Sequence, residues 1–448
     1  MNSYDFSDLV LLIGTNPLPN FVVAKYFMEN NPNLHRIWMI ISEDTQFQES
    51  TKKLADNLRS VLTEINKDMK NEIDFPAPFP IRDIGDAELI DNTVSSMQRK
   101  IIKLENFCKV HLNYTGGTKS MSVHAYHTIK EKFEAGQCEF SYLDGRDFKL
   151  KMDFQKSKTI SKMRQKVNIS TLELIKLHDC NKVGEFEKKK EKTLNTIKEL
   201  EPARKYLEGL IGTENWQEKW RGFSDNGYLL KTIVDDMYSK QEKENSLPLE
   251  TRMQKYVANE HVLEAMRLLS PEYRLLQDDN TIVPKNDGKR RNTNEKAADF
   301  FGGVWLEHYL YEFLNTKIKE MDEVKDAPQT TAIETDVSIK KENTQNKDFQ
   351  IDLLLINGYQ VCGISCTTDA TPKICKGKGF EIIHRTQQFG GEEAKAILVC
   401  FLENEQIEDF ETDIKSHTST DSKFKVLGID DLAPDRLWEK INEFVWEN

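Results

Sequence analysis

Two short glycine-containing turns carry residues that suit the binding of an anion. The first turn, Gly14-Thr15-Asn16, ends the apolar run Leu9–Gly14, and the second, Thr115–Lys119, follows the run Val110–Tyr114. Glycine has no Cβ atom, so backbone N–H groups can approach an anion closely. A helix opening at Thr118 would add unpaired N–H groups and the positive end of its dipole. The sequence therefore predicts a phosphate or nucleotide site, with an ordinary tight turn as the alternative. The candidate residues are Gly14, Thr15, Asn16, Thr115, Gly116, Gly117, Thr118 and Lys119.

A second candidate site centres on Asp352, an acidic residue inside the apolar run Phe349–Ile356. A buried carboxylate is costly unless it binds a metal or has a hydrogen-bond partner. Asn357-Gly358 follows, a strong signal for a β-hairpin, and Gln360–Cys366 is the expected return strand. Carboxylates on such a hairpin can hold Mg²⁺ or Mn²⁺ and activate a water for attack on a phosphodiester. The alternative is that Asp352 is a hydrogen-bonded edge residue.

The return strand lacks two groups that would complete such a metal site. A second acid, followed two residues later by a lysine, is the usual arrangement, but Ser365 and Thr367 occupy these positions. We expect Glu307, on the helix before the hairpin, to hold metal together with Asp352. Downstream candidates for the missing groups are Glu381 and Lys376, with Lys373 and Lys378 as further possibilities.

Other catalytic motifs are absent from the sequence. It contains no Gly-x-Ser-x-Gly, no Walker A motif and no HExxH. No histidine has an arginine five to seven residues before it, which excludes the pattern of one large ribonuclease class. The seven cysteines form no CxxC pair, which indicates reduced thiols in a cytoplasm.

The first third of the chain alternates short apolar runs with helical stretches. Strands are expected at Leu9–Gly14, Arg36–Ser42, Phe79–Ile84, Val110–Tyr114, Cys138–Asp144 and Asp147–Asp153, and helices at Asn20–Glu29, Asp44–Lys67, Ala87–Leu104 and from Thr118 to about Ala135. This alternation predicts a largely parallel sheet with helices on both faces. Ligands bind beyond the C-terminal ends of such strands, so both glycine turns should lie on one edge of the sheet.

The rest of the chain divides at about residue 296. Residues 156–296 have apolar residues at helical spacing, with a charged run at Glu187–Lys192 that reads as a solvated helix face. Lys285–Lys296 reads as a polar linker, although Lys289, Arg290 and Arg291 could touch a phosphate backbone. Residues 297–448 form a second α/β unit. Its expected elements are helices at Phe301–Lys319, Gly379–Phe389 and Pro434–Glu447, and strands at Thr330–Ile339, Phe349–Ile356, Gln360–Cys366, Lys395–Leu402 and Lys423–Ile429.

The composition limits the classes of protein to consider. The chain has 448 residues, of which 38% are hydrophobic and 30% charged, with a net charge of −12. This length allows two or three domains. The net charge argues against a protein coated in basic surface for gripping long nucleic acid. No apolar run approaches the roughly 20 residues of a membrane span, and the first residues lack the basic region of a secretory signal, so we expect no membrane association.

These motifs resemble those of one group of type III CRISPR effectors. The N-terminal segment resembles the CRISPR-associated Rossmann fold (CARF) sensor through Asn113–Met121 and Gly14-Thr15-Asn16. The C-terminal segment resembles the PD-(D/E)XK-like nuclease domain that is fused to this sensor. The residues that carry the second resemblance are Phe301–Glu307, Ile351–Leu354, and Arg385, Gln388, Phe389, Gly390 and Gly391 of the following helix.

The resemblance implies an α/β protein with three parts. Residues 1–155 would be the Rossmann-like CARF sensor, residues 156–296 a helical region that could include a winged helix, and residues 297–448 a restriction-endonuclease-like α/β domain. Such proteins are homodimers that bind a cyclic oligoadenylate, most often the tetra-adenylate, across the two-fold axis. The nuclease domains then cut DNA or RNA with Mn²⁺ or Mg²⁺.

One departure from the family divides the functional hypotheses. The family's return strand reads Ile-Glu-Cys-Lys-Thr, whereas this chain has Ile364-Ser365-Cys366-Thr367-Thr368. Our first hypothesis is a cyclic-oligoadenylate-activated, metal-dependent nuclease in which nearby residues replace the lost ones. The second is a catalytically degenerate sensor that binds nucleic acid or a protein partner without cutting. The third is a transcription regulator with a winged helix in the middle segment.

Overall fold

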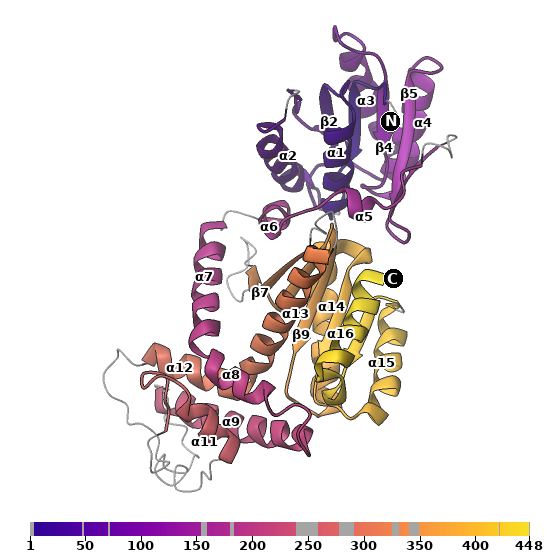
Figure 1. Cartoon of the computed structure of the whole chain (residues 1–448). Helices are drawn as coiled ribbons and strands as arrows, with labels where there is room; N and C mark the ends of the chain where they lie inside the picture. Colours follow the sequence, from indigo (N-terminus) through magenta and orange to yellow (C-terminus); the bar gives the residue numbers. More distant parts are fainter. Residues whose placement is uncertain are drawn as a thin grey trace.

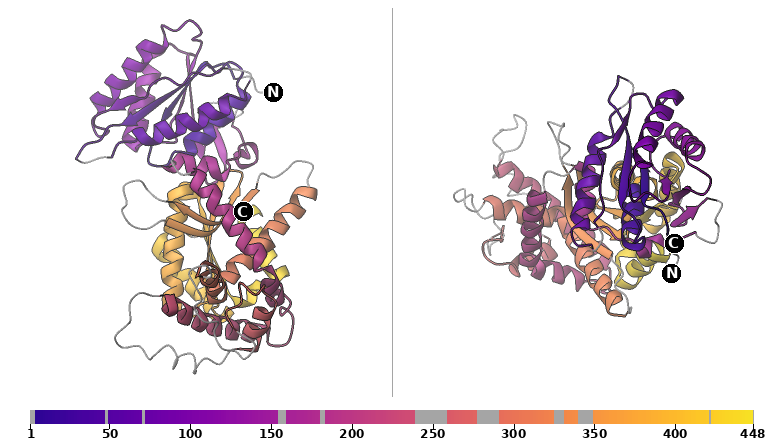
Figure 2. Two further views of the ribbon diagram at one scale, coloured as in Figure 1. Left: turned by 90° about the vertical axis from the view of Figure 1, so that its left-hand side faces the viewer. Right: turned by 90° about the horizontal axis from the view of Figure 1, so that it is seen from above.

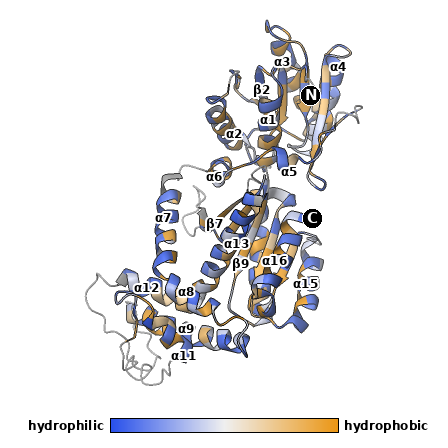
Figure 3. Ribbon diagram, viewed as in Figure 1, coloured by the Kyte–Doolittle hydropathy of each residue, from blue (hydrophilic) through white to orange (hydrophobic). Residues whose placement is uncertain are grey.

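The computed structural model of the chain has two α/β units that lie end to end, with a group of helices beside the second (Figures 1 and 2). It describes residues 4–46, 49–69, 72–153, 159–179, 183–238, 259–276, 291–324, 331–339, 349–420 and 422–447. Apolar residues follow the strands of both units, as Figure 3 shows. Among the helices of the described residues, none combines the length and the apolar character that crossing a membrane requires.

The N-terminal unit is built on a six-stranded sheet with the order β3-β2-β1-β4-β5-β6. Its strands are β1 (Asp8–Leu12), β2 (Arg36–Ser42), β3 (Phe79–Ile81), β4 (Val110–Asn113), β5 (Cys138–Asp144) and β6 (Lys149–Met152). Strands β1 to β5 are parallel, and β6 is antiparallel to β5. The chain builds the sheet outward from β1 to β3 and then crosses to β4 on the other side of β1. The order therefore reverses between β1 and β4, which is where Rossmann-like sheets bind ligands.

Helices cover both faces of this sheet. They are α1 (Leu18–Asn30), α2 (Lys52–Asn66), α3 (Ala87–Ile101) and α4 (Lys119–Lys132). Leu9 and Leu11 of β1 pack in the core that contains α1 and α2, while Val10 and Leu12 pack in the core that contains α3 and α4. Because both faces are buried, these strands read as continuous apolar runs rather than as alternating ones.

The helix expected at Asp44–Lys67 begins later, at Lys52. The preceding segment is held against β2 by side chains: the Ser42 backbone N–H donates to Thr51 Oγ1 over 3.0 Å, and the Thr51 backbone N–H donates to Ser42 Oγ over 3.1 Å. Hydroxyl side chains that bond backbone groups in this way compete with helix formation.

Seven helices are described in the middle of the chain. They are α5 (Met163–Lys166), α6 (Thr171–Asp179), α7 (Val183–Glu199), α8 (Glu201–Glu208), α9 (Trp216–Tyr238), α11 (Glu260–Arg267) and α12 (Arg291–Asp299). Helix α7 runs from the junction of the two units to the helices beside the second unit (Figure 1). The described residues between 183 and 276 form no strand. The linker prediction at Lys285–Lys296 was wrong from Arg291 onward, where α12 begins, and Lys289 and Arg290 lie outside the described residues.

These middle helices share a core with the C-terminal unit. Trp220 of α9 packs edge-on against Trp305, with ring centroids 4.8 Å apart. Gly227 allows α9 to approach closely, because a Cβ atom there would lie 1.9 Å from the carbonyl oxygen of Phe301. Phe301 belongs to η2 (Phe300–Val304), a π-helical turn that leads into α13 (Trp305–Val324).

The C-terminal unit has a five-stranded sheet with the order β11-β10-β9-β8-β7. Its strands are β7 (Thr331–Ile339), β8 (Phe349–Asn357), β9 (Gln360–Cys366), β10 (Lys395–Val399) and β11 (Phe424–Leu427). Strands β7, β8 and β9 are antiparallel neighbours, while β9, β10 and β11 are parallel. The expected hairpin at Asn357-Gly358 is confirmed, with Gly358 at φ +65°. Leu353 pairs with Ile364, so the register places Asp352 opposite Ser365.

Helices also cover both faces of the second sheet. They are α13 and α16 (Pro434–Asn442) on one face and α14 (Pro372–Gly390) and α15 (Asn404–Thr418) on the other, with the single turns η3 (Gly391–Glu393), η4 (Ile429–Leu432) and η5 (Glu443–Glu447). Helix α15 was not among the elements expected from the sequence, and the helix expected at Gly379–Phe389 begins earlier, at Pro372. Thr371 before Pro372 was the signal for the true start, since proline is favoured in the first turn of a helix.

The two units meet at the turn of the β8–β9 hairpin. The Ile169 backbone N–H donates to the Gly358 carbonyl over 2.9 Å, and Arg164 Nη1 donates to Gln360 Oε1 over 2.7 Å. The same segment is tied to the first unit, because Lys25 Nζ of α1 donates to the Asn168 carbonyl over 2.9 Å. The hairpin that carries Asp352 therefore has its turn against the N-terminal unit.

Candidate ligand pocket and candidate metal site

The two glycine turns meet at the C-terminal edge of β1 and β4. A Cβ atom on Gly14 would lie 2.9 Å from the backbone nitrogen of Gly117, so the two turns are in contact. A Cβ atom on Gly116 would lie 2.1 Å from the Leu12 carbonyl oxygen, and Gly117 has φ +75°. Glycine is therefore required at both positions: a side chain at Gly116 would clash with the backbone, and Gly117 has a positive φ that other residues rarely adopt.

The hydroxyl groups of the second turn differ in their roles. Thr115 Oγ1 accepts a hydrogen bond of 2.6 Å from the Leu143 backbone N–H, which ties the turn to β5. Thr118 is the N-cap of α4, and its Oγ1 accepts from the Met121 backbone N–H over 3.3 Å. Thr118 and Lys119 are exposed and lie outside the pocket lining. The structure thus brings six of the eight candidate residues together and leaves these two at the rim of the turn.

Asn16 offers an unused donor at this edge. Its Oδ1 accepts a hydrogen bond of 2.9 Å from the Leu18 backbone N–H, which fixes the side chain at the start of α1. Its Nδ2 is buried and has no hydrogen-bond partner among the described residues. A buried polar group without a partner is destabilising, so its presence beside the glycine turns is best explained by a ligand that accepts from it.

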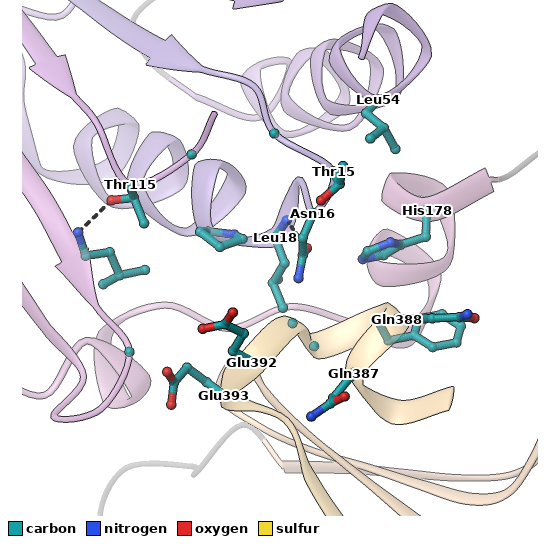
Figure 4. Close-up of a pocket in the computed structure, with 18 of the residues that line it drawn as sticks. Thr15, Asn16, Leu18, Leu54, Thr115, His178, Gln387, Gln388, Glu392 and Glu393 are labelled. Carbon is teal, nitrogen blue, oxygen red and sulfur yellow. Dashed lines mark hydrogen bonds between the residues drawn. The ribbon is translucent and has the colours of Figure 1, made fainter. Parts of the chain in front are cut away.

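A pocket of about 1470 Å³ opens between the glycine turns and the C-terminal unit. Figure 4 shows Thr15, Asn16 and Thr115 on one side and Glu392, Glu393 and Gln387 on the other. The C-terminal lining, which the sequence reading did not associate with this site, comprises Tyr359, Gln360, Gln387, Gln388, Phe389, Gly390, Gly391, Glu392, Glu393, Thr418, Ser419, Thr420 and Lys423.

Asp352 is held by the return strand of its own hairpin. Its Oδ2 accepts hydrogen bonds from the Cys366 backbone N–H over 2.7 Å and from Ser365 Oγ over 3.0 Å. Its Oδ1 accepts no hydrogen bond from the described residues. Burial raises the pKa of the Asp352 carboxyl, against the lowering effect of these hydrogen bonds and of Lys378. The carboxylate is thus oriented through one oxygen and open at the other.

Glu307, on the first turn of α13, lies near Asp352. Burial, and next the charge of Asp352, raise the pKa of Glu307 well above its ordinary value, while Lys378 lowers it. Asp336 of β7 adds to the rise, but this residue already pairs with Lys189 of α7 at 2.9 Å. The two carboxyl groups expected to hold metal are therefore within electrostatic reach of each other.

The two other predicted catalytic residues have partners elsewhere. Lys376 Nζ forms an ion pair of 2.5 Å with Asp413 of α15, and Glu381 is exposed and pairs with Arg385 on its own helix. Lys378, which the sequence reading mentioned only as a further possibility, acts on the pKa of both Glu307 and Asp352. Successive helical residues are about 100° apart, so Lys376 and Lys378 face nearly opposite directions.

The carboxylates of Glu307 and Asp352 fit a site in which the protein supplies only two ligands to a divalent cation such as Mg²⁺. Across the described ranges, no group of three or more His, Cys, Asp or Glu side chains is arranged to hold a metal ion. Mg²⁺ commonly uses only one or two protein carboxylates, together with waters and substrate phosphates. Glu307 and Asp352 match that smaller set, because a bound cation would offset both the cost of burying the charged carboxylate and the repulsion by Asp352, which together raise the pKa of Glu307.

Comparison with known proteins supports the assignment of the N-terminal unit. Residues 9–173 match the family model described as the Card1 CARF domain. This match extends past residue 155 to include α5 and part of α6, and Lys176 of α6 pairs with Glu64 of α2 at 2.5 Å. No curated protein matches the sequence at a significant level.

Two solved structures are similar to nearly the whole chain. Protein VC1899 from Vibrio cholerae is 13% identical, with 98% of this chain and 97% of that chain covered and a TM-score of 0.61. Can2 from Sulfobacillus thermosulfidooxidans, solved in complex with cyclic tetra-adenylate, is 14% identical, with 98% and 97% covered and a TM-score of 0.54. At these identities the likeness is one of fold. The family match and the Rossmann-like strand order of the first sheet indicate the same kind of domain. Residues 9–173 of this chain are a CARF domain.

Proposed function

We propose that this chain is a cyclic-oligoadenylate-activated, metal-dependent nuclease of type III CRISPR antiviral defence that cuts DNA or RNA. The observation that carries the proposal is the pocket between the CARF glycine turns and the C-terminal unit. The backbone N–H groups of the glycine turns and the unpaired Asn16 Nδ2 suit the phosphates of such a ring. Can2, solved with cyclic tetra-adenylate, favours the tetra-adenylate.

A homodimer is the expected assembly. A ring with two-fold symmetry offers the same set of phosphates to two copies of one glycine edge, which is an isologous arrangement. Binding energy that differs between two arrangements of the dimer would then shift the C-terminal units.

For the C-terminal unit we propose a restriction-endonuclease-like site with Asp352 and Glu307 as ligands of Mn²⁺ or Mg²⁺. Such an ion would polarise the scissile phosphate and lower the pKa of an attacking water. The open Oδ1 of Asp352 is the oxygen that would bind it, since Oδ2 is already engaged by Cys366 and Ser365. Lys378 supplies a positive charge beside both carboxylates, as the lysine missing at position 367 would.

The hairpin gives a physical connection between the pocket and this site. Its turn is bonded to the segment after the CARF sheet through Gly358 and Gln360, and its strands lead directly to Asp352 and Ser365. A change at the junction on ligand binding would move both strands of the hairpin together.

The proposal is tested by one assay with the purified chain. Cyclic tri-, tetra- and hexa-adenylate would each be combined with Mn²⁺ or Mg²⁺ and with single- and double-stranded DNA and RNA. We expect cleavage that depends on both the tetra-adenylate and the metal. Absence of cleavage in every combination would refute the nuclease.

Replacing Lys378 by methionine should lower the cleavage rate by about a hundredfold, because the transition state loses a nearby positive charge. Binding of the cyclic oligoadenylate should not change. Lys376→Met is the matched control: it removes a lysine of the same helix that pairs with Asp413, and its effect should be small. The measurement is single-turnover cleavage with saturating activator and Mn²⁺; a larger loss in Lys376→Met would instead assign the role to Lys376.

A catalytically degenerate sensor is the second candidate function. The observation that favours it is the hydrogen bond from Ser365 Oγ to Asp352 Oδ2, at the position where the family has an acid. Such a protein would bind cyclic tetra-adenylate and nucleic acid without cutting. Activator-dependent binding of DNA or RNA in a gel-shift assay, with no cleavage under any metal, would select it.

A further inference from the structure

The ligand pocket has a second wall, which the C-terminal unit supplies. The wall is formed by the end of α14 and by η3, and it touches the CARF domain at two points. A Cβ atom on Gly391 would lie 2.4 Å from Asn16 Nδ2, and a Cβ atom on Gly145 would lie 2.2 Å from Glu393 Cγ. A ligand at the glycine turns would therefore also face η3.

The two acidic residues of η3 differ in their pairing. Glu393 Oε2 forms an ion pair of 3.1 Å with Lys423, whose Nζ also donates to the Glu392 carbonyl oxygen over 2.6 Å. The side chain of Glu392 is exposed and takes no hydrogen bond or ion pair from the described residues. In Figure 4 its carboxylate rises from η3 toward the CARF side of the pocket. On the C-terminal side of the pocket, the carboxylate of Glu392 thus carries a negative charge without a partner among the described residues.

This charge dictates how an anionic nucleotide ring can lie in the pocket. Charges of like sign repel each other, and the repulsion grows when a bound ligand excludes water from the space between them. Phosphates are therefore favoured at the glycine turns and disfavoured at Glu392. The groups that a carboxylate accepts from are the exocyclic amino groups of bases and the hydroxyls of riboses, and such charge-assisted hydrogen bonds are the stronger kind.

We propose that Glu392 accepts a hydrogen bond from a nucleoside N–H or O–H donor of the bound ring, so that the activator is read by the C-terminal unit as well as by the CARF domain. This inference rests on the proposed function and adds a residue that determines specificity. Glu392 lies just past the end of α14, and Lys378 lies twelve residues before Gly390 on the same helix, which is about 18 Å of helix. The contact would join the ligand to the helix that carries Lys378.

Calorimetric titration of the 448-residue chain with cyclic tetra-adenylate tests the inference. Glu392→Ala should weaken binding by about tenfold to a hundredfold, the usual worth of a hydrogen bond to a charged group. Glu405→Ala, an exposed acid in the first turn of α15 outside the pocket, is the matched control and should bind as the wild type does.

Two analogues identify the donor. Cyclic tetra-inosinate lacks the amino group, and cyclic tetra-2′-deoxyadenylate lacks the hydroxyl. Whichever donor is used, the wild type should discriminate against the analogue that lacks it, and Glu392→Ala should lose that discrimination. Equal or tighter binding of cyclic tetra-adenylate by Glu392→Ala would overturn the inference, because the carboxylate would then only repel phosphates. Wild type that binds no cyclic oligoadenylate would overturn the proposed function itself, and the inference with it.

Discussion

Asp352→Asn is expected to reduce metal-dependent cleavage by about a thousandfold or more, while cyclic tetra-adenylate still binds. Asparagine keeps the shape of the side chain and an oxygen that can accept from the Cys366 backbone N–H, but it removes the negative charge. With only Glu307 left as a carboxylate, the site would lose one of its two metal ligands and several kcal/mol of stabilisation of the transition state. The measurement is single-turnover cleavage at saturating activator over a range of Mn²⁺ concentrations.

Two further variants make this result interpretable. Glu307→Gln should show the same loss, because the two carboxylates would act on one ion. Asp409→Asn, an exposed acid on α15, should cleave as the wild type does. Full activity in Asp352→Asn would remove Asp352 from the metal site and leave it as a hydrogen-bonded residue of the hairpin.

Gly116→Ala should abolish tight binding of cyclic tetra-adenylate. The new Cβ atom would lie 2.1 Å from the Leu12 carbonyl oxygen and 2.7 Å from Asn20 Oδ1, so the turn must move away from β1. Overpacking of this kind costs about 1 to 3 kcal/mol of folding free energy. A displaced turn also withdraws its N–H groups from the ligand, and a loss of about 3 kcal/mol in binding is roughly a hundredfold in affinity. Calorimetric titration and thermal unfolding measure the two effects.

The control for this variant is Gly85→Ala in the same domain. A Cβ atom there would approach only Asp83 Oδ1, at 3.2 Å, in an exposed turn. The Gly85→Ala variant should bind as the wild type does.

Asn16→Asp is a second probe of the phosphate site. It keeps an oxygen to accept from the Leu18 backbone N–H, but replaces the unpaired Nδ2 with a negative oxygen. If both Gly116→Ala and Asn16→Asp bound normally, the phosphates would lie elsewhere.

Some of the fold was predictable because it depends on local pattern. The strands Arg36–Ser42 and Gln360–Cys366 have the bounds that the sequence indicates, since buried strands are short apolar runs between turn residues. The Asn357-Gly358 hairpin follows from a local backbone preference. Helix starts were less predictable: α2 begins at Lys52 rather than Asp44 because Ser42 and Thr51 bond each other's backbone.

The candidate metal site shows where local pattern stops being sufficient. The sequence identifies Asp352 by its polarity within an apolar run. It does not decide which lysine faces this residue, because that depends on the rotation of α14 about its own axis. Packing sets the rotation: Gly363 of β9 leaves room for Thr386, whose Oγ1 would lie 2.1 Å from a Cβ atom at position 363. Lys378 then lies within electrostatic reach of the carboxylates, and Lys376 pairs with Asp413.

The sequence by itself determined the two sheets, the glycine turns and their position on the ligand-binding edge of the first sheet, because these depend on residue type, spacing and the rules of parallel sheets. Only the tertiary structure decided what faces that edge. Glu392 and Asn16 are 376 positions apart in the sequence, and no local sequence pattern relates them. Both line one pocket because the hairpin turn at Gly358 docks against the segment after the CARF sheet, which brings η3 to the glycine turns. Contacts between distant segments arise from the packing of whole units, which no short stretch of sequence encodes.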